Sequence, residues 1–152
     1  MNAEAAPVNA APASDERVRH VLVADDEPHI GRIIQLKFEQ GPFEVTLAAD
    51  GQEALDALAD SPHVDLVVLD LMMPRLSGLD VLERLRADER FRDVPCIVLT
   101  AAGQEQQYRR AMALGATDFM TKPFSPKKLY ARAAELAGVG PADAAGDAAA
   151  RP

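Results

Sequence analysis

The sequence predicts an α/β domain built on a parallel β-sheet, and three observations support this class. Short, continuously apolar runs rich in β-branched residues recur along the chain, as expected of strands that helices cover on both faces. Amphipathic stretches separate these runs, so that strands and helices alternate. The chain has 152 residues, 48% of them hydrophobic, which fits one compact domain with a single core.

Five segments are predicted to form the strands of this sheet. Residues 21–23, 66–69 and 97–99 are the continuously apolar runs, and we expect them at the centre of the sheet. Residues 45–47 and 117–120 mix polar with apolar side chains, which is typical of strands at or near an edge.

Five helices are predicted from apolar residues at helical spacing, one after each strand. In chain order, the apolar positions are Ile30, Ile33, Ile34 and Phe38; Ala54, Leu55 and Leu58; Leu79, Leu82 and Leu85; Tyr108, Ala111 and Met112; and Leu129, Ala133 and Leu136.

The two ends of the chain differ from this pattern. Residues 1–17 and 139–152 are rich in small and polar residues and have no apolar periodicity, so both are predicted to be disordered tails. Residues 18–138 are predicted to be the folded domain. No DNA-binding or enzymatic segment is recognisable after residue 137, so we expect output to pass through a partner protein.

Composition argues against several classes of function. The net charge is −8, from 24 acidic and 16 basic residues, whereas a nucleic-acid surface is usually basic. No apolar run approaches the roughly 18 residues of a membrane span, and no export signal is recognisable. The single cysteine, Cys96, lies in an apolar run and is predicted to be buried. We therefore expect a cytoplasmic protein with no direct nucleic-acid or membrane contact.

Polar residues follow four of the predicted strands. Asp25 and Asp26 come after the first strand and Asp70 after the third. Thr100 ends the fourth strand, and Lys122 lies shortly after the fifth. Because ligands of open parallel sheets bind beyond the carboxyl ends of the strands, we expect these five side chains to converge at one edge.

The chemistry of this set points to phosphoryl transfer. Three neighbouring carboxylates raise one another's pKa unless a cation holds them, and Mg²⁺, or alternatively Mn²⁺, suits such oxygen ligands. Asp70, on the central strand, is the best candidate for a carboxylate nucleophile toward phosphorus. The ammonium of Lys122 and the hydroxyl of Thr100 would then bind the phosphoryl oxygens.

The chain resembles the receiver domains of two-component response regulators. Four motifs, in the expected order, carry the resemblance: VLVADDE, VVLDLMMPRLSG, IVLTA and TKPF. It implies a flavodoxin-like three-layer α/β/α sandwich with five helices and a five-stranded parallel sheet of order 2-1-3-4-5. The single-domain, chemotaxis-regulator-like type would be a stand-alone switch, phosphorylated by a sensor histidine kinase and acting as a regulator rather than an enzyme.

The resemblance also assigns a role to each polar residue. Asp70 corresponds to the phosphoacceptor, which also binds the metal. Asp25 and Asp26 correspond to the acidic pair of the metal site, Thr100 to the switch hydroxyl and Lys122 to the phosphoryl-binding lysine.

Three further assignments rest on the resemblance alone. The backbone carbonyl of Met72 would complete the metal site, and the peptide between Lys122 and Pro123 would be cis. Phe119 falls on the aromatic switch position, although a packed core aromatic would fit equally well. Met72 and Ala102 are apolar where many relatives carry polar groups that influence dephosphorylation, so the lifetime of the phosphorylated state stays open.

Alternative functions remain beside the phosphorylation-controlled interaction module. In that module the surface around Tyr108, Arg109, Met112, Phe119 and residues 126–136 would meet a downstream protein, as a monomer or a phosphorylation-dependent dimer. A phosphorelay intermediate would instead pass the group to a histidine phosphotransfer protein. A Mg²⁺-dependent phosphohydrolase of the haloacid-dehalogenase type is less favoured, because such enzymes carry a second Asp two residues after the nucleophile, where this chain has Met72.

Overall fold

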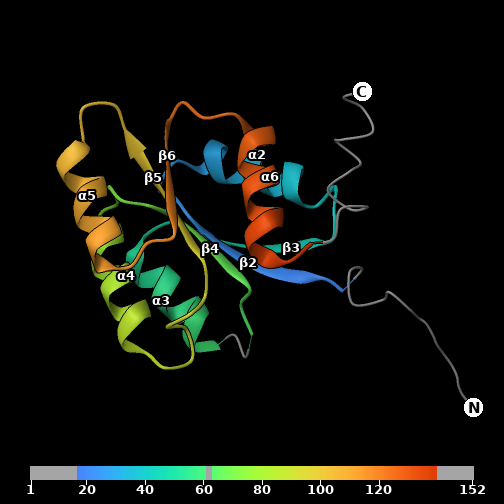
Figure 1. Cartoon of the computed structure of the whole chain (residues 1–152), viewed down its shortest axis with the longest axis horizontal. Helices are drawn as coiled ribbons and strands as arrows, with labels where there is room; N and C mark the ends of the chain where they lie inside the picture. The colour runs from blue at the N-terminus through green and yellow to red at the C-terminus, as the bar shows by residue number, and fades with distance from the viewer. Residues whose placement is uncertain (1–16, 61–62, 140–152) are drawn as a thin grey trace, which may run out of the picture.

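The computed structural model describes residues 17–60 and 63–139, in which strands and helices alternate (Figure 1). The strands are β2 (Arg19–Ala24), β3 (Phe43–Ala48), β4 (Leu66–Asp70), β5 (Cys96–Ala101) and β6 (Asp118–Lys122). The helices are α2 (Pro28–Phe38), α3 (Gly51–Asp60), α4 (Gly78–Ala87), α5 (Glu105–Leu114) and α6 (Pro126–Ala137). Apart from Arg17 and Val139, the two predicted tails lie outside the described residues.

The strands form one parallel sheet in the order β3-β2-β4-β5-β6. Counted along the chain this is the order 2-1-3-4-5, so the expected flavodoxin-like topology is confirmed. The apolar strands are central, and every residue of β4 is buried. The edge strands β3 and β6 carry exposed or half-buried side chains, as the mixed sequences of these two segments predicted.

Helices cover both faces of the sheet and bury a core on each side. Helices α2 and α6 pack together on one face, whereas α4 lies between α3 and α5 on the other (Figure 1). Alternate residues of β2 contribute to the two cores, with Leu22 on the α3–α5 side and Val23 on the α2–α6 side. Cys96 is fully buried, as predicted. No described helix is long and apolar enough to span a bilayer.

Two of the predicted apolar helix faces were partly wrong. Ile33 of α2 is 42% exposed and Met112 of α5 is 39% exposed. Each is adjacent to a buried residue, Ile34 and Ala111 respectively. Neighbouring helical residues are turned about 100° apart, and in each of these two pairs one residue points into the core while the other points toward solvent.

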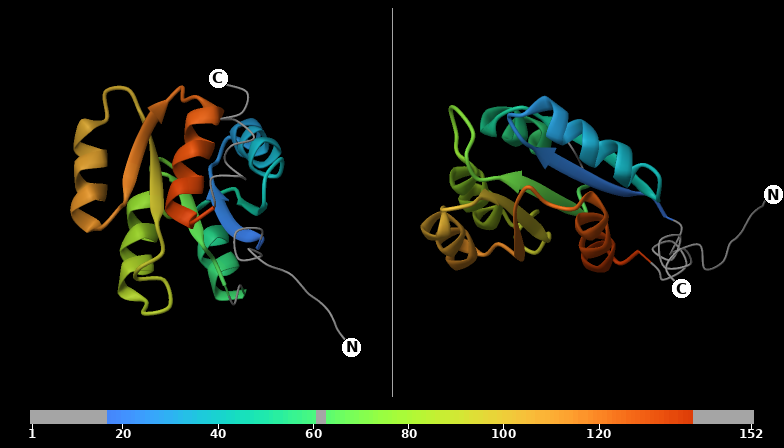
Figure 2. Two further views of the ribbon diagram at one scale, coloured as in Figure 1. Left: turned by 45° about the vertical axis from the view of Figure 1, so that its right-hand side comes forward. Right: turned by 90° about the horizontal axis from the view of Figure 1, so that it is seen from above.

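The edge strand β6 lies between α5 and α6 (Figure 2).

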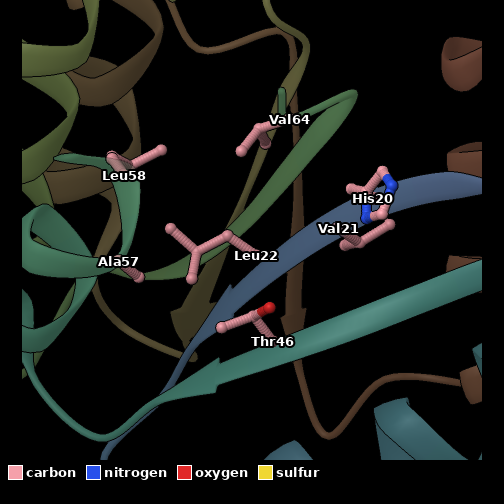
Figure 3. A pocket seen from close by; sticks show the side chains of 7 residues that line it. All are labelled: His20, Val21, Leu22, Thr46, Ala57, Leu58 and Val64. Carbon is pink, nitrogen blue, oxygen red and sulfur yellow. The ribbon is translucent and has the colours of Figure 1, made fainter. Parts of the chain in front are cut away.

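At the amino-terminal end of the sheet, His20 contacts Glu44 and His63 contacts Asp65, at 3.1 and 2.8 Å. A small cavity beside His20 reaches the side chains of α3 (Figure 3). Its volume of about 40 Å³ has room for no more than a few water molecules. This cavity is therefore too small for an organic ligand.

The start of α4 is packed directly against the end of β4. Ser77 caps the helix: its hydroxyl accepts a hydrogen bond from the Asp80 amide, and the Asp80 carboxylate accepts one from the Ser77 amide. A Cβ atom on Gly78 would lie 2.2 Å from the carbonyl oxygen of Asp70. Glycine is therefore required where the helix meets the strand.

We expect Gly78→Ala to lower the free energy of unfolding by about 1–3 kcal/mol, because the added methyl group overlaps backbone atoms. Gly31→Ala is the matched control. Its methyl group would lie 3.4 Å from Leu47 Cδ2, and alanine in a helix interior is favoured over glycine by about 1 kcal/mol. Urea denaturation of both variants measures the contrast, and equal losses would contradict the close packing at Gly78.

Candidate functional site

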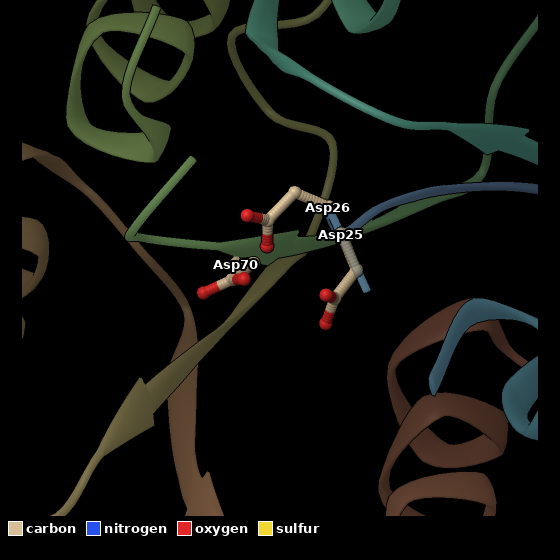
Figure 4. A group of neighbouring side chains, drawn as sticks. All are labelled: Asp25, Asp26 and Asp70. Carbon is tan, nitrogen blue, oxygen red and sulfur yellow. The ribbon is translucent and has the colours of Figure 1, made fainter. Parts of the chain in front are cut away.

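Three carboxylates meet where β2 and β4 end (Figure 4). Asp25 and Asp26 follow β2, and Asp70 is the last residue of β4. Ala24 pairs with Leu69, so the next residue along each strand is a carboxylate. One oxygen of each of the three lies within 4.8 Å of the others. The sequence prediction that strand ends bring these aspartates together is confirmed.

The environment of Asp70 favours its neutral form. Burial is the main cause, and the charge of Asp25 adds to it, raising the pKa of Asp70 to about 6. Hydrogen bonds from the Met72 amide, 3.1 Å from Asp70 Oδ1, and from Lys122 oppose this change. A carboxylate that is costly to ionise in the free protein is suited to bind a cation or accept a charged group.

Lys122 lies at the centre of this acidic group. Its Nζ atom is 2.9 Å from Asp25 Oδ2 and donates a hydrogen bond of 3.2 Å to Asp70 Oδ2. Burial alone would lower the pKa of Lys122, but its hydrogen bonds and the two aspartate charges raise the pKa overall. The ammonium therefore stays protonated and partly neutralises the cluster.

Glu27 is a member of the site that the sequence analysis missed. Its Oε1 atom accepts a hydrogen bond of 2.9 Å from Lys122 Nζ. This hydrogen bond is the largest cause of the lowered pKa of Glu27. The signal was its position directly after Asp25 and Asp26, where it extends the acidic run by one residue.

Thr100 and Met72 lie at the same edge of the sheet. Thr100 is buried near the end of β5, one residue beyond Leu99, the partner of Asp70. The side chain of Met72 is half-exposed, whereas its backbone amide bonds the Asp70 carboxylate. The peptide between Lys122 and Pro123 is cis, as the resemblance implied.

Phe119 lies on β6 and is half-buried. Its ring stacks on Tyr108 of α5, with the ring centroids 4.2 Å apart and the planes 18° apart. This contact joins the edge strand to the helix beside it, within the surface that the sequence analysis selected. Movement of Phe119 on activation stays a prediction.

The donor set fits a hard divalent cation. All three candidate side chains offer carboxylate oxygens, which Mg²⁺ and Mn²⁺ prefer. Asp25 Oδ2 is buried and contacts Lys122, yet it accepts no aligned hydrogen bond within the described ranges. A buried carboxylate oxygen of this kind retains free coordinating capacity.

Comparison with known proteins gives a consistent result. A family model described as the response regulator receiver domain matches residues 21–134. The chain is 44% identical over 118 residues to the probable transcriptional regulator ycf27 of Cyanophora paradoxa, which covers 78% of this chain and 48% of that protein. It is 40% identical over 114 residues to the phosphate regulon transcriptional regulatory protein PhoB of Escherichia coli, covering 75% and 49%. The chain thus spans about half the length of these relatives.

Solved structures show the same architecture. The receiver domain of Francisella response regulator 1452 is 36% identical, with a TM-score of 0.71 over 79% of this chain and 97% of that one. The chemotaxis protein CheY4 of Vibrio cholerae is 27% identical, with a TM-score of 0.72 over 78% and 98%.

Proposed function

We propose, since this chain belongs to the family of response regulator receiver domains, that it accepts a phosphoryl group on Asp70 from a sensor histidine kinase. Receiver domains are regulatory phosphoacceptors, and phosphorylation and Mg²⁺ binding are general features of the family. The single observation that carries the proposal is the contact of Asp70 with Lys122 inside the three-aspartate cluster. A carboxylate that could act as the nucleophile, an ammonium and a carboxylate group that could hold a metal ion therefore lie together.

The phosphoryl transfer would proceed by displacement at phosphorus. An oxygen of the Asp70 carboxylate forms the new P–O bond while the P–N bond to the donor histidine breaks, and the imidazole nitrogen leaves with the electron pair. Lys122, already bonded to Asp70, would neutralise charge on the phosphoryl oxygens. Thr100, near the end of the adjacent strand, would donate a hydrogen bond to one of them.

Asp25, Asp26, Asp70 and the backbone carbonyl of Met72 would hold the metal. When bound, Mg²⁺ would supply neutralisation of the negative charge on the transferring group. The contacts of Lys122 change in this scheme, because its ammonium, which bonds Glu27 and Asp70 in the structure, would also bond the phosphoryl oxygens. Phosphorylation would therefore draw its ammonium away from Glu27.

We infer that output passes through protein contacts of this domain. The surface formed by α5, β6 and α6 is the proposed contact, because it carries the Tyr108–Phe119 stack and includes the strand that ends in Lys122. Substitutions there should leave phosphorylation of Asp70 intact and weaken partner binding.

A phosphorelay role is tested by adding a histidine phosphotransfer protein to the domain that carries a labelled phosphoryl group. Label that moves to the histidine of that protein identifies a relay, and label that stays on the domain identifies a terminal switch.

We expect the apparent affinity for Mg²⁺ to fall as the pH drops below about 6. The metal binds the ionised carboxylate, so protons compete once the pH is below the pKa of Asp70, about 6. Each further decrease of one pH unit then lowers the apparent affinity for Mg²⁺ close to tenfold, about the effect of one competing proton. Calorimetric titrations between pH 5 and 8 measure this, and above pH 7 the affinity should be nearly constant.

Asp88→Asn serves as the control for this titration. It removes a half-buried carboxylate that pairs with Arg90 beyond α4, away from the cluster. This variant should give the wild-type pH profile. An affinity for Mg²⁺ that does not change from pH 5 to 8 in the wild type would contradict the assignment of Asp70 as a ligand.

Beryllofluoride, a mimic of the phosphoryl group, provides the functional test. It should bind the wild type only in the presence of Mg²⁺ and should not bind Asp70→Asn. Absence of binding to the wild type with Mg²⁺ would argue against the proposed function.

A further inference from the structure

The loop that follows β4, residues 71–77, is tied to the start of α3 by an ion pair. Arg75 donates from Nη2 and Nε to Asp50 Oδ2, at 2.6 and 3.1 Å. The Asp50 side chain is only 8% exposed, whereas that of Arg75 is 67% exposed. Asp50 Oδ1 also accepts a hydrogen bond of 2.8 Å from the Glu53 amide. The carboxylate is therefore fixed at the start of α3, one residue before the helix, and the arginine is bound to a fixed point.

The backbone of this loop is packed closely against α3. A Cβ atom on Gly51 would lie 2.2 Å from the carbonyl oxygen of Leu76. Arg75 itself has φ +69°, in the left-handed region that side chains other than glycine rarely adopt. Since arginine has no intrinsic preference for this conformation, interactions within the fold must hold it. The two hydrogen bonds from the Arg75 side chain to Asp50 are interactions of this kind.

The same loop contacts the acidic cluster three residues earlier. The Met72 amide donates its hydrogen bond to Asp70 Oδ1. The short segment from Met72 to Arg75 is therefore held at both ends, by Asp70 on the sheet and by Asp50 just before α3. A shift at the Arg75 end would change the orientation of the Met72 peptide beside the carboxylates.

We propose that Arg75, acting through Asp50, is a positioning residue for the metal site. The ion pair holds the loop so that the Met72 carbonyl remains available to a divalent cation. This inference rests on the proposed function, because it assumes that the three-aspartate cluster binds Mg²⁺. It adds two residues, Asp50 and Arg75, that lie outside the cluster.

The chain contains a second arginine–aspartate pair that serves as a matched control for the Asp50–Arg75 pair. Arg90 bonds Asp88 through Nη2 and Nε, at 2.9 and 3.2 Å, and its side chain is 61% exposed. An exposed arginine bonded to an aspartate usually contributes little to stability. If both pairs had only a structural effect, their loss would have the same consequences. If the Asp50–Arg75 pair positions the loop, only its loss should affect the metal site.

The experiment compares Arg75→Gly with Arg90→Gly in the full chain. Glycine accepts a positive φ, so Arg75→Gly removes the tether without imposing backbone strain. We expect it to weaken Mg²⁺ binding, measured by calorimetry at pH 7.5, by about 3- to 10-fold. This is below the 10–100-fold typical of residues that bond a ligand directly. In the metal-free protein, hydrogen exchange of the Met72 amide should accelerate. Arg90→Gly should leave both properties at wild-type values, and Arg75→Lys should lie between.

Asp50→Asn breaks the charge of the same pair from the other side while retaining an acceptor for the Glu53 amide. It should weaken Mg²⁺ binding in the same direction as Arg75→Gly. The inference would be overturned if Asp50→Asn and Arg75→Gly both bound Mg²⁺ with wild-type affinity. It would also be overturned if Arg90→Gly lost as much affinity for Mg²⁺ as Arg75→Gly. Failure of the wild type itself to bind Mg²⁺ would overturn the proposed function, and this inference with it. These outcomes are distinguishable because the last is seen before any variant is made.

Discussion

Asp70→Asn is expected to make the metal-free protein more stable at pH 7.5, by up to about 3 kcal/mol, while abolishing phosphorylation. Burial, together with the charge of Asp25, raises the pKa of Asp70 from 3.8 to about 6. That difference corresponds to about 3 kcal/mol of free energy disfavouring the ionised carboxylate in the folded state. Asparagine approximates the neutral form and avoids this cost.

The pH dependence of this effect has a defined sign. Between pH 3.8 and about 6 the folded state binds the Asp70 proton more tightly than the unfolded chain does. The contribution of Asp70 to stability is therefore present at low pH and is lost as the pH rises through about 6. The variant and the wild type should differ little near pH 4 and most above about pH 6.5.

Urea denaturation of the variant and the wild type, near pH 4 and at pH 7.5, measures the difference in the free energy of unfolding. Asp88→Asn is the control, because the hydrogen bonds of Arg90 lower the pKa of Asp88 and its loss should not stabilise the fold. Equal stability of Asp70→Asn and the wild type at pH 7.5 would contradict the buried, disfavoured carboxylate described for the site.

Lys122→Ala is expected to slow phosphorylation of Asp70 by small phosphodonors at least about 100-fold, the loss usual when one charge-stabilising donor is removed. Its Nζ atom contacts both Asp25 and Asp70, so this one change removes a positive charge from beside two of the three aspartates. The variant should be less stable than the wild type without metal, because two buried carboxylates lose their counter-charge. Added Mg²⁺ should restore part of that stability.

The rate is measured with acetyl phosphate at saturating Mg²⁺, so that the effect on metal binding is separated from the effect on transfer. Lys128→Ala removes an exposed ammonium from the first turn of α6 and should retain the wild-type rate. An unchanged rate in Lys122→Ala would exclude the lysine from the transfer step.

The residues that the sequence placed correctly are those at the ends of strands. Asp25 and Asp70 could be predicted to meet because parallel strands in register bring their final residues to one edge. Asp50 follows β3 in the same way, so the same rule extended to this strand would have selected it. Periodicity failed for Ile33, because an apolar residue next to a buried one also fits a helical pattern.

Other contacts could not be predicted from the sequence around each residue. Arg75 lies 25 residues from Asp50, and their pairing depends on the course of two loops that meet only in the folded chain. The positive φ of Arg75 could not be expected, because arginine does not favour that region. Glu27 could be suspected from the acidic run, but its bond to Lys122 joins residues 95 positions apart.

Intact mass spectrometry after incubation with acetyl phosphate is the most direct test of the central claim that Asp70 accepts a phosphoryl group. The wild type should gain the mass of one phosphoryl group only when Mg²⁺ is present, and Asp70→Ala should gain none. A wild type that gains no mass with Mg²⁺, or an Asp70→Ala variant that gains the same mass, would contradict the claim.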